Sequence, residues 1–535
     1  MICLGFDYGT TNSLLARVMD ASSGDIWLME RKPSAIMMDG RFIQSPKRLL
    51  SVPGYDGNLV SKCVTGLTKE MLQNRSLSGD EPVRLTVTVP NAFKDAQCKL
   101  ILDAVTQAGQ AVFGEERLPS GAVSLLPEPV AAALYYVYLK AMDIPSQGIL
   151  VVCDIGGGTT DLAVVQFRVE RTEGNRVVTF HVICTDGDDQ LGGDDIDRIL
   201  AGHLKGTYSL SDGQYDDETL LAATRALKRK LSSAWFDEEV EVALSSPEKT
   251  VQAVIETGTF EHLGEPLVFR LNKSSFEKLI CTDSRNPMET LLSRFARKAN
   301  SLKERYALKA SDPEAHLDPD LSRCIILPVG GSSRIPRLQE VMKEVFGGEL
   351  FILPGEGDSP DRPTPFDSVV KGASIYSAWL SGSLNGFGDI RIKGRTLHRI
   401  SLRATDGKLI TIVDRNMPAG EEERLEIYEV KEKLHPERAD DDQSFSLKEI
   451  ELYQGDGKRV GDAKSGKPPV LMSHLTDRLA GLNDKIYLNG RALNEVPVEI
   501  SLGINKDGRV ACLNIRVEGG NKDGSLYELP IRLIE

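Results

Sequence analysis

The chain contains 535 residues with a formal net charge of −14; 41% of the residues are hydrophobic and 27% are charged. This length exceeds what one hydrophobic core normally serves, so two or more domains are expected. The acidic balance argues against nucleic acid as the main partner, since phosphate contacts need clustered Lys and Arg, and no apolar run approaches the roughly 20 residues of a membrane span.

The chain starts with MICLGFDYG, which lacks the regions of a signal peptide and already has the character of a strand. Its 8 cysteines are scattered and form no Cys-x-x-Cys pair. Cys3, Cys153 and Cys324 lie in apolar strand-like runs, so buried free thiols are expected. Together these features predict a cytoplasmic protein without membrane association.

An apolar run from residue 2 leads into Asp7, and a second apolar run follows Gly9, Thr10 and Thr11. This order predicts a strand, a glycine turn and a second strand. A turn of this composition can surround an anion with backbone N–H groups and hydroxyls.

The next stretch predicts helices over residues 59–71 and 95–108 and a strand over residues 85–89, which ends before Pro90. Pro129 is suited to the first turn of a further helix, which places Glu128 at the start of that helix. Before these elements, Lys47 and Arg48 form a basic pair, and such pairs are usually solvated.

The sequence VVCDIGGGTTDLAVV, residues 151–165, repeats the pattern of the first hairpin. Three glycines at 156–158 and Thr159 would hold an anion, and Asp154 and Asp161 flank them. Because carboxylates repel phosphate, the presence of Asp154 and Asp161 is explained by a hard cation that lies between the carboxylates and the phosphate. Two copies of this hairpin predict an internally duplicated domain that grips a nucleoside triphosphate and its metal across a cleft.

The chain continues with an acidic glycine turn at residues 186–197, which leads into a helix. A helix over residues 217–235 carries Arg225, Lys228, Arg229 and Ser232 on one face. A buried strand over residues 324–329 precedes a third glycine turn at 330–336, and helices follow over residues 336–346 and from 365 to about 380.

Composition then changes at SGSLNGFG, residues 381–388, and alternation replaces helical periodicity over residues 496–504, 511–517 and 529–533. We therefore predict an α/β domain over residues 1–382, a linker over residues 383–395 and a separate all-β domain over residues 396–535.

Eight segments in the same order resemble the seventy-kilodalton heat-shock chaperones (DnaK-like), within the actin-like ATPase superfamily. They are FDYGTTNS, PKRLL, VTVPNAFKDAQ, PEPVAAAL, DIGGGTTDLAVV, DGDDQLGGDDID, LKRKLSSA and PVGGSSRIPRLQEV. The resemblance implies a duplicated actin-like (ribonuclease H-like) nucleotide-binding domain followed by a β-sandwich substrate domain. The resemblance to the β-sandwich domain is weaker and rests on the segments SLRATDGKLITIVDRNMPAG and EVPVEISLGINKDGRV.

By this resemblance the phosphates of ATP or ADP would be held by Gly9, Thr10 and Thr11 on one side and by Gly156, Gly157, Gly158 and Thr159 on the other. Asp7 and Asp154 would hold the water shell of Mg²⁺, and with Asp161 they are candidate ligands for K⁺. Lys47 would neutralise charge at the γ-phosphate and Glu128 would hold the attacking water, which suits phosphoryl transfer.

The resemblance also implies which residues contact the nucleoside. Gly192, Gly193 and Asp194 would approach the phosphates and the opposite lobe. The adenosine pocket would be made by Lys228, Arg229, Ser232, Gly330, Gly331, Ser332, Arg334 and Asp367.

Several positions depart from the family pattern. Cys98 replaces an arginine that relays nucleotide state, and Arg225 replaces a glutamate expected to bond the ribose, so Arg225→Glu is expected to tighten nucleotide binding. The linker lacks the family's leucines, and no helical lid is expected after the β domain. These changes predict weak coupling between the two domains.

The sequence thus predicts a chaperone-like ATPase whose β domain binds unfolded or specific client polypeptides, with a co-chaperone or nucleotide exchange factor as further candidate partners. Two alternatives stay open. One is a nucleotide-dependent scaffold or switch without chaperone cycling, and the other is a sugar kinase of the same superfamily.

Overall fold

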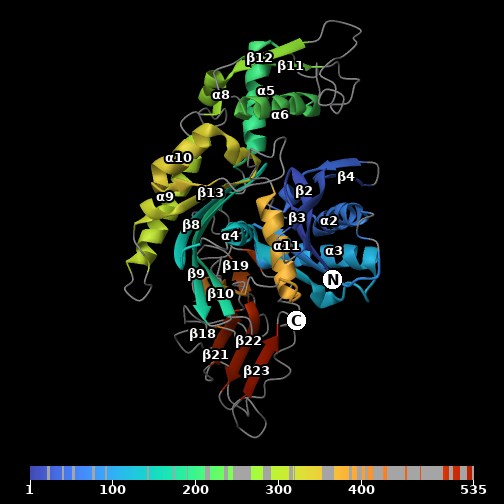
Figure 1. Cartoon of the computed structure of the whole chain (residues 1–535), viewed down its shortest axis with the longest axis vertical. Coiled ribbons are helices and arrows are strands. Elements are labelled where there is room, and N and C mark those ends of the chain that lie inside the picture. Colours follow the sequence, from blue (N-terminus) through green and yellow to red (C-terminus); the bar gives the residue numbers. More distant parts are fainter. Residues whose placement is uncertain are drawn as a thin grey trace.

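The structure is a computed structural model of the whole chain (Figure 1). It describes residues 1–20, 25–38, 41–50, 55–74, 77, 79–90, 93–140, 144–172, 175–188, 191–210, 217–233, 239–244, 267–280, 291–311, 317, 320–351, 367–384, 388–393, 400–403, 408–413, 426–429, 452–454, 470–471, 498–504, 510–517 and 527–532.

The first half of the molecule is built on a five-stranded sheet with the strand order β3-β2-β1-β6-β7. β1 pairs antiparallel with β2 and parallel with β6. The strands are β1 (Ile2–Tyr8), β2 (Asn12–Asp20), β3 (Asp25–Pro33), β6 (Val83–Val89) and β7 (Val123–Pro127).

Alternation along β1 decides what covers each face of this sheet. Ile2, Leu4 and Phe6 point into a core that is completed by helices α2 (Gly57–Leu72) and α3 (Asp95–Phe113). Gly5 lies on the other face, where a Cβ atom would overlap the backbone of Val370. The small elements β4 (Ala35–Met38), β5 (Arg41–Gln44), α1 (Pro46–Leu49) and η2 (Ser120–Ala122) complete this half.

The second half repeats the plan in a six-stranded sheet with the order β14-β13-β8-β9-β10-β15. Its hairpin of β8 and β9 is antiparallel, and β13 joins β8 in parallel, as β6 joins β1. The strands are β8 (Gln147–Ile155), β9 (Thr160–Thr172), β10 (Asn175–Asp188), β13 (Ile325–Val329), β14 (Glu349–Leu350) and β15 (Asp389–Lys393). The matching order of the two sheets agrees with the duplication expected from the sequence.

Two helices, α4 (Glu128–Leu139) and α11 (Ser368–Leu380), occupy the centre of the molecule (Figure 1). Helix α4 begins at Glu128, with Pro129 in its first turn as expected. The helices pack so closely that a Cβ atom on Gly372 would overlap the backbone of Ala131. Both helices pack against residues of β8 and β9 in a common core.

The core on the other face of the second sheet is completed by α9 (Leu291–Ala310) and α10 (Pro336–Phe346), and the short helices η4 (Leu321–Arg323) and η5 (Gly331–Arg334) flank β13 in the chain. The same core extends into the group of elements at the top of Figure 1, which comprises α5 (Gly193–Thr207), α6 (Asp217–Ser233), β11 (Glu239–Leu244), β12 (Leu267–Asn272) and α8 (Lys273–Ile280). No helix among the residues described here is both long and apolar enough to cross a membrane.

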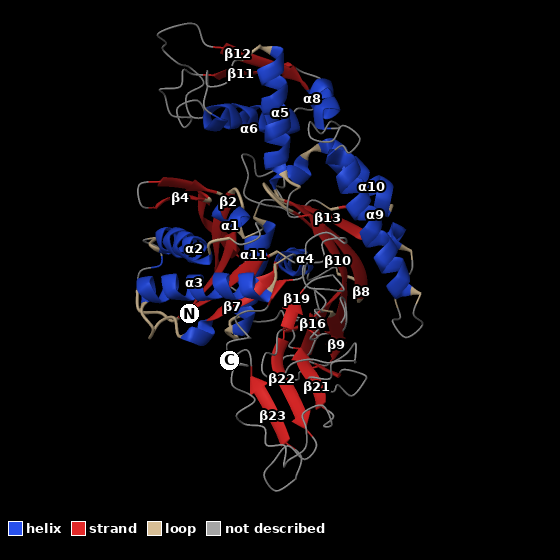
Figure 2. Ribbon diagram, turned by 180° about the vertical axis from the view of Figure 1, so that it is seen from behind, coloured by secondary structure: helices blue, strands red, loops and turns tan. Residues whose placement is uncertain are grey.

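The described strands after residue 396 form two four-stranded sheets, in which neighbouring strands pair antiparallel (Figure 2). They are β16 (Ile400–Arg403), β17 (Leu409–Val413), β18 (Glu426–Glu429), β19 (Leu452–Gln454), β20 (Val470–Leu471), β21 (Val498–Ile504), β22 (Val510–Val517) and β23 (Tyr527–Arg532). The all-β character agrees with the alternation in the sequence, while the sandwich arrangement stays a prediction.

The segment expected to be a linker contains a strand. β15 pairs in parallel with the start of β10, and Ile390 on β15 is buried. β10 then runs to Asp188, which faces Thr160 at the glycine turn between β8 and β9. One long strand therefore connects the linker to the region of the second glycine turn.

Candidate functional site

Two glycine turns, one from each half of the molecule, lie against each other. Residues 9–11 join β1 to β2, and residues 156–159 join β8 to β9. A Cβ atom on Gly157 would overlap the side chain of Thr11, and one on Gly158 would lie 2.7 Å from the Thr10 methyl carbon. Glycine is therefore required where the second turn meets the threonines of the first.

Asp7 and Asp154 occupy equivalent places in the two hairpins. Each is the next-to-last residue of its strand, and Asp154 faces Asp161 across the second hairpin. The Thr88 hydroxyl, on the neighbouring β6, donates to Asp7 Oδ1 at 3.1 Å. The sequence repeat therefore brings carboxylates to the edge of both turns.

A buried ion pair accompanies these carboxylates. Lys47 Nζ donates to Glu128 Oε1 at 2.8 Å, and the two side chains are only 5% and 7% exposed. Burial alone would lower the pKa of Lys47, but the charges of Glu128 and Asp7 raise it overall. Lys47 is therefore a fixed cation, held by the residue that begins α4.

Negative charge is in excess around this cation. Burial, followed by the charge of Glu128, raises the pKa of Asp7 to about 6, against the opposing effects of Lys47 and Thr88. Burial and the charges of Glu128, Asp161 and Asp7 raise the pKa of Asp154 well above its usual range. Several carboxylates around one ammonium group favour the arrival of a further cation.

The donor set fits a hydrated divalent cation. Carboxylate oxygens suit Mg²⁺, which usually keeps several of its water ligands. Within the part of the chain that the structure describes, no three Asp, Glu, His or Cys side chains gather closely enough to hold a metal ion. Because Mg²⁺ usually keeps its water ligands, Asp7 and Asp154 suit contact with it through water, and the expected K⁺ site with Asp161 stays a prediction.

Two further turns close around the second glycine turn. The Ser332 hydroxyl donates to the Gly156 carbonyl at 3.0 Å. The N–H groups of Gly193 and Asp194 donate to the Gly156 and Gly157 carbonyls at 3.0 and 2.6 Å. The turn at Gly192 and the turn at Gly330–Gly331, where η5 begins, are thus both anchored at the site.

Glycine is again required in both of these turns. A Cβ atom on Gly192 would lie 2.6 Å from the Gly157 carbonyl oxygen, and one on Gly330 would lie 2.6 Å from Asp154 Oδ1. Gly330 also has a φ of +78°, a conformation that favours glycine. The four turns therefore converge on the carboxylates at the ends of β1 and β8.

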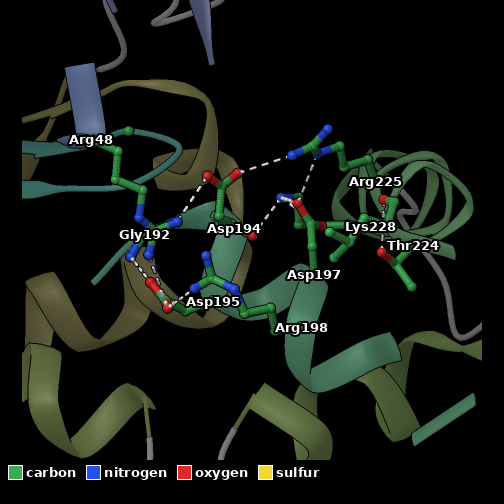
Figure 3. A network of polar contacts seen from close by, with 12 residues as sticks. Arg48, Gly192, Asp194, Asp195, Asp197, Arg198, Thr224, Arg225 and Lys228 are labelled. Atoms are coloured by element: carbon green, nitrogen blue, oxygen red, sulfur yellow. Dashed lines mark hydrogen bonds and ion pairs between the residues drawn. The ribbon is translucent and has the colours of Figure 1, made fainter. Parts of the chain in front are cut away.

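The basic face of α6 is directed largely to α5 (Figure 3). Lys228 Nζ donates to the Gly193 carbonyl at 2.7 Å and pairs with Asp197 at 2.8 Å. Arg225 pairs with Asp194 at 3.6 Å and with Asp197 at 3.5 Å. Arg225 therefore has carboxylate partners, which removes the reason to expect tighter nucleotide binding from Arg225→Glu.

The remaining expected adenosine residues are less closely joined to the four turns. Arg229 is exposed on α6, Ser232 is half-buried on the same helix, and Arg334 is half-buried at the end of η5. Asp367 precedes α11, is 1% exposed and pairs with Lys371 at 2.9 Å. Its carboxylate is enclosed by protein, so its assignment to the pocket gains no support from this position.

Sequence reasoning missed Arg48, which was interpreted as part of a solvated basic pair. The structure places its guanidinium 3.1 Å from Asp194 Oδ2 and 3.6 Å from Asp195 Oδ1 (Figure 3). Arg48 comes from α1 in the first half, whereas both aspartates begin α5 in the second half. The only signal in the sequence was the acidic turn, which gave no indication of its partner.

Comparisons with known proteins relate this chain to one family. A family model described as "Hsp70 protein" matches residues 64–433, which is more than half of the chain. A "Chaperone protein HscA homolog" from Burkholderia ambifaria (strain MC40-6) is 31% identical over 314 residues, 58% of this chain and 40% of that protein. The homolog from Burkholderia orbicola (strain MC0-3) is 32% identical over the same length, with the same shares. The match therefore spans two fifths of the length of these curated relatives.

Proposed function

The chain belongs to the Hsp70 family, and from this premise we propose that it is a chaperone-like ATPase that binds ATP and hydrolyses it slowly. The observation that carries the proposal is the meeting of two glycine turns beside a buried Lys47–Glu128 ion pair. Neither half of the molecule holds this set of groups alone.

The roles divide between the two halves. Thr10 and Thr11 of the first turn and Gly156–Gly158 and Thr159 of the second surround the β- and γ-phosphates. Lys47 neutralises charge at the γ-phosphate, and Glu128, held by Lys47 at 2.8 Å, accepts a hydrogen bond from the attacking water. Positioning and charge stabilisation of this kind supply most of the catalysis in phosphoryl transfer.

Asp7 and Asp154 would hold the Mg²⁺ that accompanies the nucleotide. When bound, this ion would supply positive charge that offsets the repulsion between carboxylates and phosphates. Thr88 fixes the orientation of the Asp7 carboxylate by its hydrogen bond of 3.1 Å.

The nucleoside lies toward α6 and η5. Lys228 is linked to the phosphate side through the Gly193 carbonyl, and Ser332 is linked through Gly156. Arg229, Ser232 and Arg334 are retained as adenosine contacts, and Asp367 acts on this pocket only indirectly, because Lys371 already pairs with its carboxylate.

The β strands after residue 396 form the part that binds an unfolded or specific client polypeptide. Co-chaperones or an exchange factor act on the α/β part. The observation that favours a second candidate, a nucleotide switch without chaperone cycling, is the burial of Cys98 at 2% exposure, because no charged relay residue stands there. Family membership disfavours the sugar kinase.

Calorimetry with ATP and Mg²⁺ tests the binding half of the proposal. Gly157→Ala places a methyl group where the Thr11 side chain lies, so binding should weaken about tenfold or more, by the loss of a well-oriented contact to charge. Gly202→Ala is the matched control, because a Cβ atom at Gly202 in α5 meets no atom within 4 Å. Absence of ATP binding by the wild-type protein would contradict the proposal.

A further inference from the structure

One ion-pair group bridges the two halves of the molecule, and we call Arg48, Asp194 and Asp195 the clamp (Figure 3). Arg48 lies 3.1 Å from Asp194 and 3.6 Å from Asp195. The Arg48 side chain is 23% exposed and the two aspartates are 9% and 7% exposed. Pairs with this degree of burial are stronger than surface pairs, because water screens them less.

Both ends of the clamp are adjacent to groups of the candidate site. Arg48 directly follows Lys47, whose ammonium group holds Glu128. On the other side the Asp194 N–H donates to the Gly157 carbonyl at 2.6 Å. A displacement at either end of the clamp would therefore move Lys47 relative to the second glycine turn.

Each aspartate of the clamp also has a partner arginine in its own half. Arg198 lies 2.7 Å from Asp195, and Arg225 lies 3.6 Å from Asp194. These two arginines are on α5 and α6 and do not cross to the first half. Arg198 and Arg225 therefore share the aspartates with Arg48, but they do not join the two halves.

We propose that Arg48 is a positioning residue for ATP hydrolysis. It holds Lys47 and Glu128 of the first half against the second glycine turn, so that the groups at the γ-phosphate are aligned. The inference rests on the proposed function, and it adds a residue and a mechanism of assembly to it. A misplacement of about 1 Å in such a site is enough to cost about 10²-fold in rate.

Single-turnover hydrolysis at saturating ATP tests the proposal. Arg48→Ala should slow the step about tenfold or more, whereas ATP affinity should change less, and Arg48→Lys should restore part of the rate because one ion pair can re-form. Arg198→Ala is the matched control, since it removes a shorter ion pair to the same Asp195. It should slow hydrolysis less than Arg48→Ala does, because Arg198 and Asp195 lie on the same helix, α5, and their pair does not join the two halves.

A purely structural role for the network predicts the reverse order, with Arg198→Ala at least as harmful as Arg48→Ala. That result, or a wild-type rate in Arg48→Ala, would overturn the proposal. Thermal unfolding of each variant identifies a variant that fails to fold, in which case Arg48→Lys decides.

Hydrogen exchange of the nucleotide-free protein separates this inference from the proposed function. Peptides covering α1 and residues 191–196 should exchange faster in Arg48→Ala than in the wild type, and those covering α10 should not. If the wild type binds no ATP, the proposed function fails while exchange still tests the clamp. Unchanged exchange in both regions of Arg48→Ala contradicts the clamp whatever the nucleotide does.

Discussion

Arg225 lies between two carboxylates of α5, Asp194 at 3.6 Å and Asp197 at 3.5 Å. In the sequence Arg225 stands where the family resemblance implies a glutamate that bonds the ribose. Intervals of three and four residues predicted correctly that Arg225 and Lys228 share a face of α6, but they gave no information on what that face contacts. The partners come from a helix nearly 30 residues earlier, so only the tertiary structure identifies them.

The effect of Arg225→Glu should therefore be unfavourable. A glutamate would place a third carboxylate beside Asp194 and Asp197, and like charges repel. We expect a lower melting temperature and ATP affinity that is no tighter than in the wild type, measured by thermal unfolding and calorimetry. Arg225→Gln, which keeps donor groups without adding negative charge, should lose less stability. Tighter ATP binding by Arg225→Glu than by the wild type would contradict this prediction.

The surroundings of Cys98 show why an arginine at this position alone should not restore the relay of the family. It is 2% exposed on α3, in the core that packs α2 and α3 on the first sheet. The sequence predicted buried thiols from Cys3, Cys153 and Cys324, and these three are buried, whereas it singled out Cys98 only as the replacement of an arginine. The arginine that the family has at this position gives no indication that Cys98 lies in an apolar core.

Cys98→Arg should therefore destabilise the protein. Enclosing an unpaired guanidinium in an apolar core costs about 3–5 kcal/mol, and urea unfolding monitored by circular dichroism measures this loss. Cys98→Ala is the control, with an expected cost of about 1 kcal/mol for the small cavity. Equal stability of Cys98→Arg and the wild type would mean that the arginine reaches a carboxylate or solvent.

At the scale of elements, β10 and α9 are joined by charge. Asp186 on β10 lies 3.5 Å from both Lys298 and Arg305, and Asp188 lies 3.0 Å from Arg294. Burial alone would raise the pKa of Asp186, but a hydrogen bond from Ser301 and the charges of Arg305 and Lys298 lower it overall. The ionised carboxylate therefore stabilises the contact between strand and helix.

This contact should depend on pH in a defined direction. Because the folded pKa of Asp186 lies below its ordinary value of 3.8, its contribution is complete above that pH and is lost as the pH falls through the folded pKa. We expect Asp186→Asn to cost about 1–3 kcal/mol near neutral pH and the difference from the wild type to shrink at about pH 3.

Urea titrations at the two pH values measure this difference. Asp103→Asn is the control, since Asp103 forms an exposed pair with Lys99 within α3, and it should cost less than about 0.5 kcal/mol. A cost for Asp186→Asn that does not change with pH would exclude the ionised carboxylate as its source.

Elements whose ends are marked by proline or glycine were predicted well from the sequence. Pro336 and Gly347 bound α10, and the helix covers residues 336–346 as expected. Glycine turns preceded by apolar runs predicted the hairpins of β1 with β2 and of β8 with β9. β15 was missed as a strand, because its partner β10 lies more than 200 residues earlier and local pattern carries no information on such pairing.

At the scale of the whole molecule, duplication places complementary groups on two sheets. β1 and β8 each deliver an aspartate and a glycine turn, while Lys47, Glu128 and Thr88 come from the first half and from α4. The repeat was visible in the sequence, but the closeness of the two turns required the packing of α4 and α11 between the sheets. The expected weak coupling to the β domain stays a prediction, and the pairing of β15 with β10 ties the segment before that domain to the second sheet.

The central claim is that Lys47 and Glu128 act on ATP held between the two glycine turns. Single-turnover hydrolysis of radiolabelled ATP with Mg²⁺ tests it most directly, in the wild type, Lys47→Ala and Glu128→Ala. Arg337→Ala is the control, because Arg337 pairs along the surface of α10 with Glu340 and Glu344. Each site variant should bind ATP and hydrolyse it at least about 10²-fold more slowly, and the control should match the wild type. Wild-type rates in Lys47→Ala and Glu128→Ala would contradict the account.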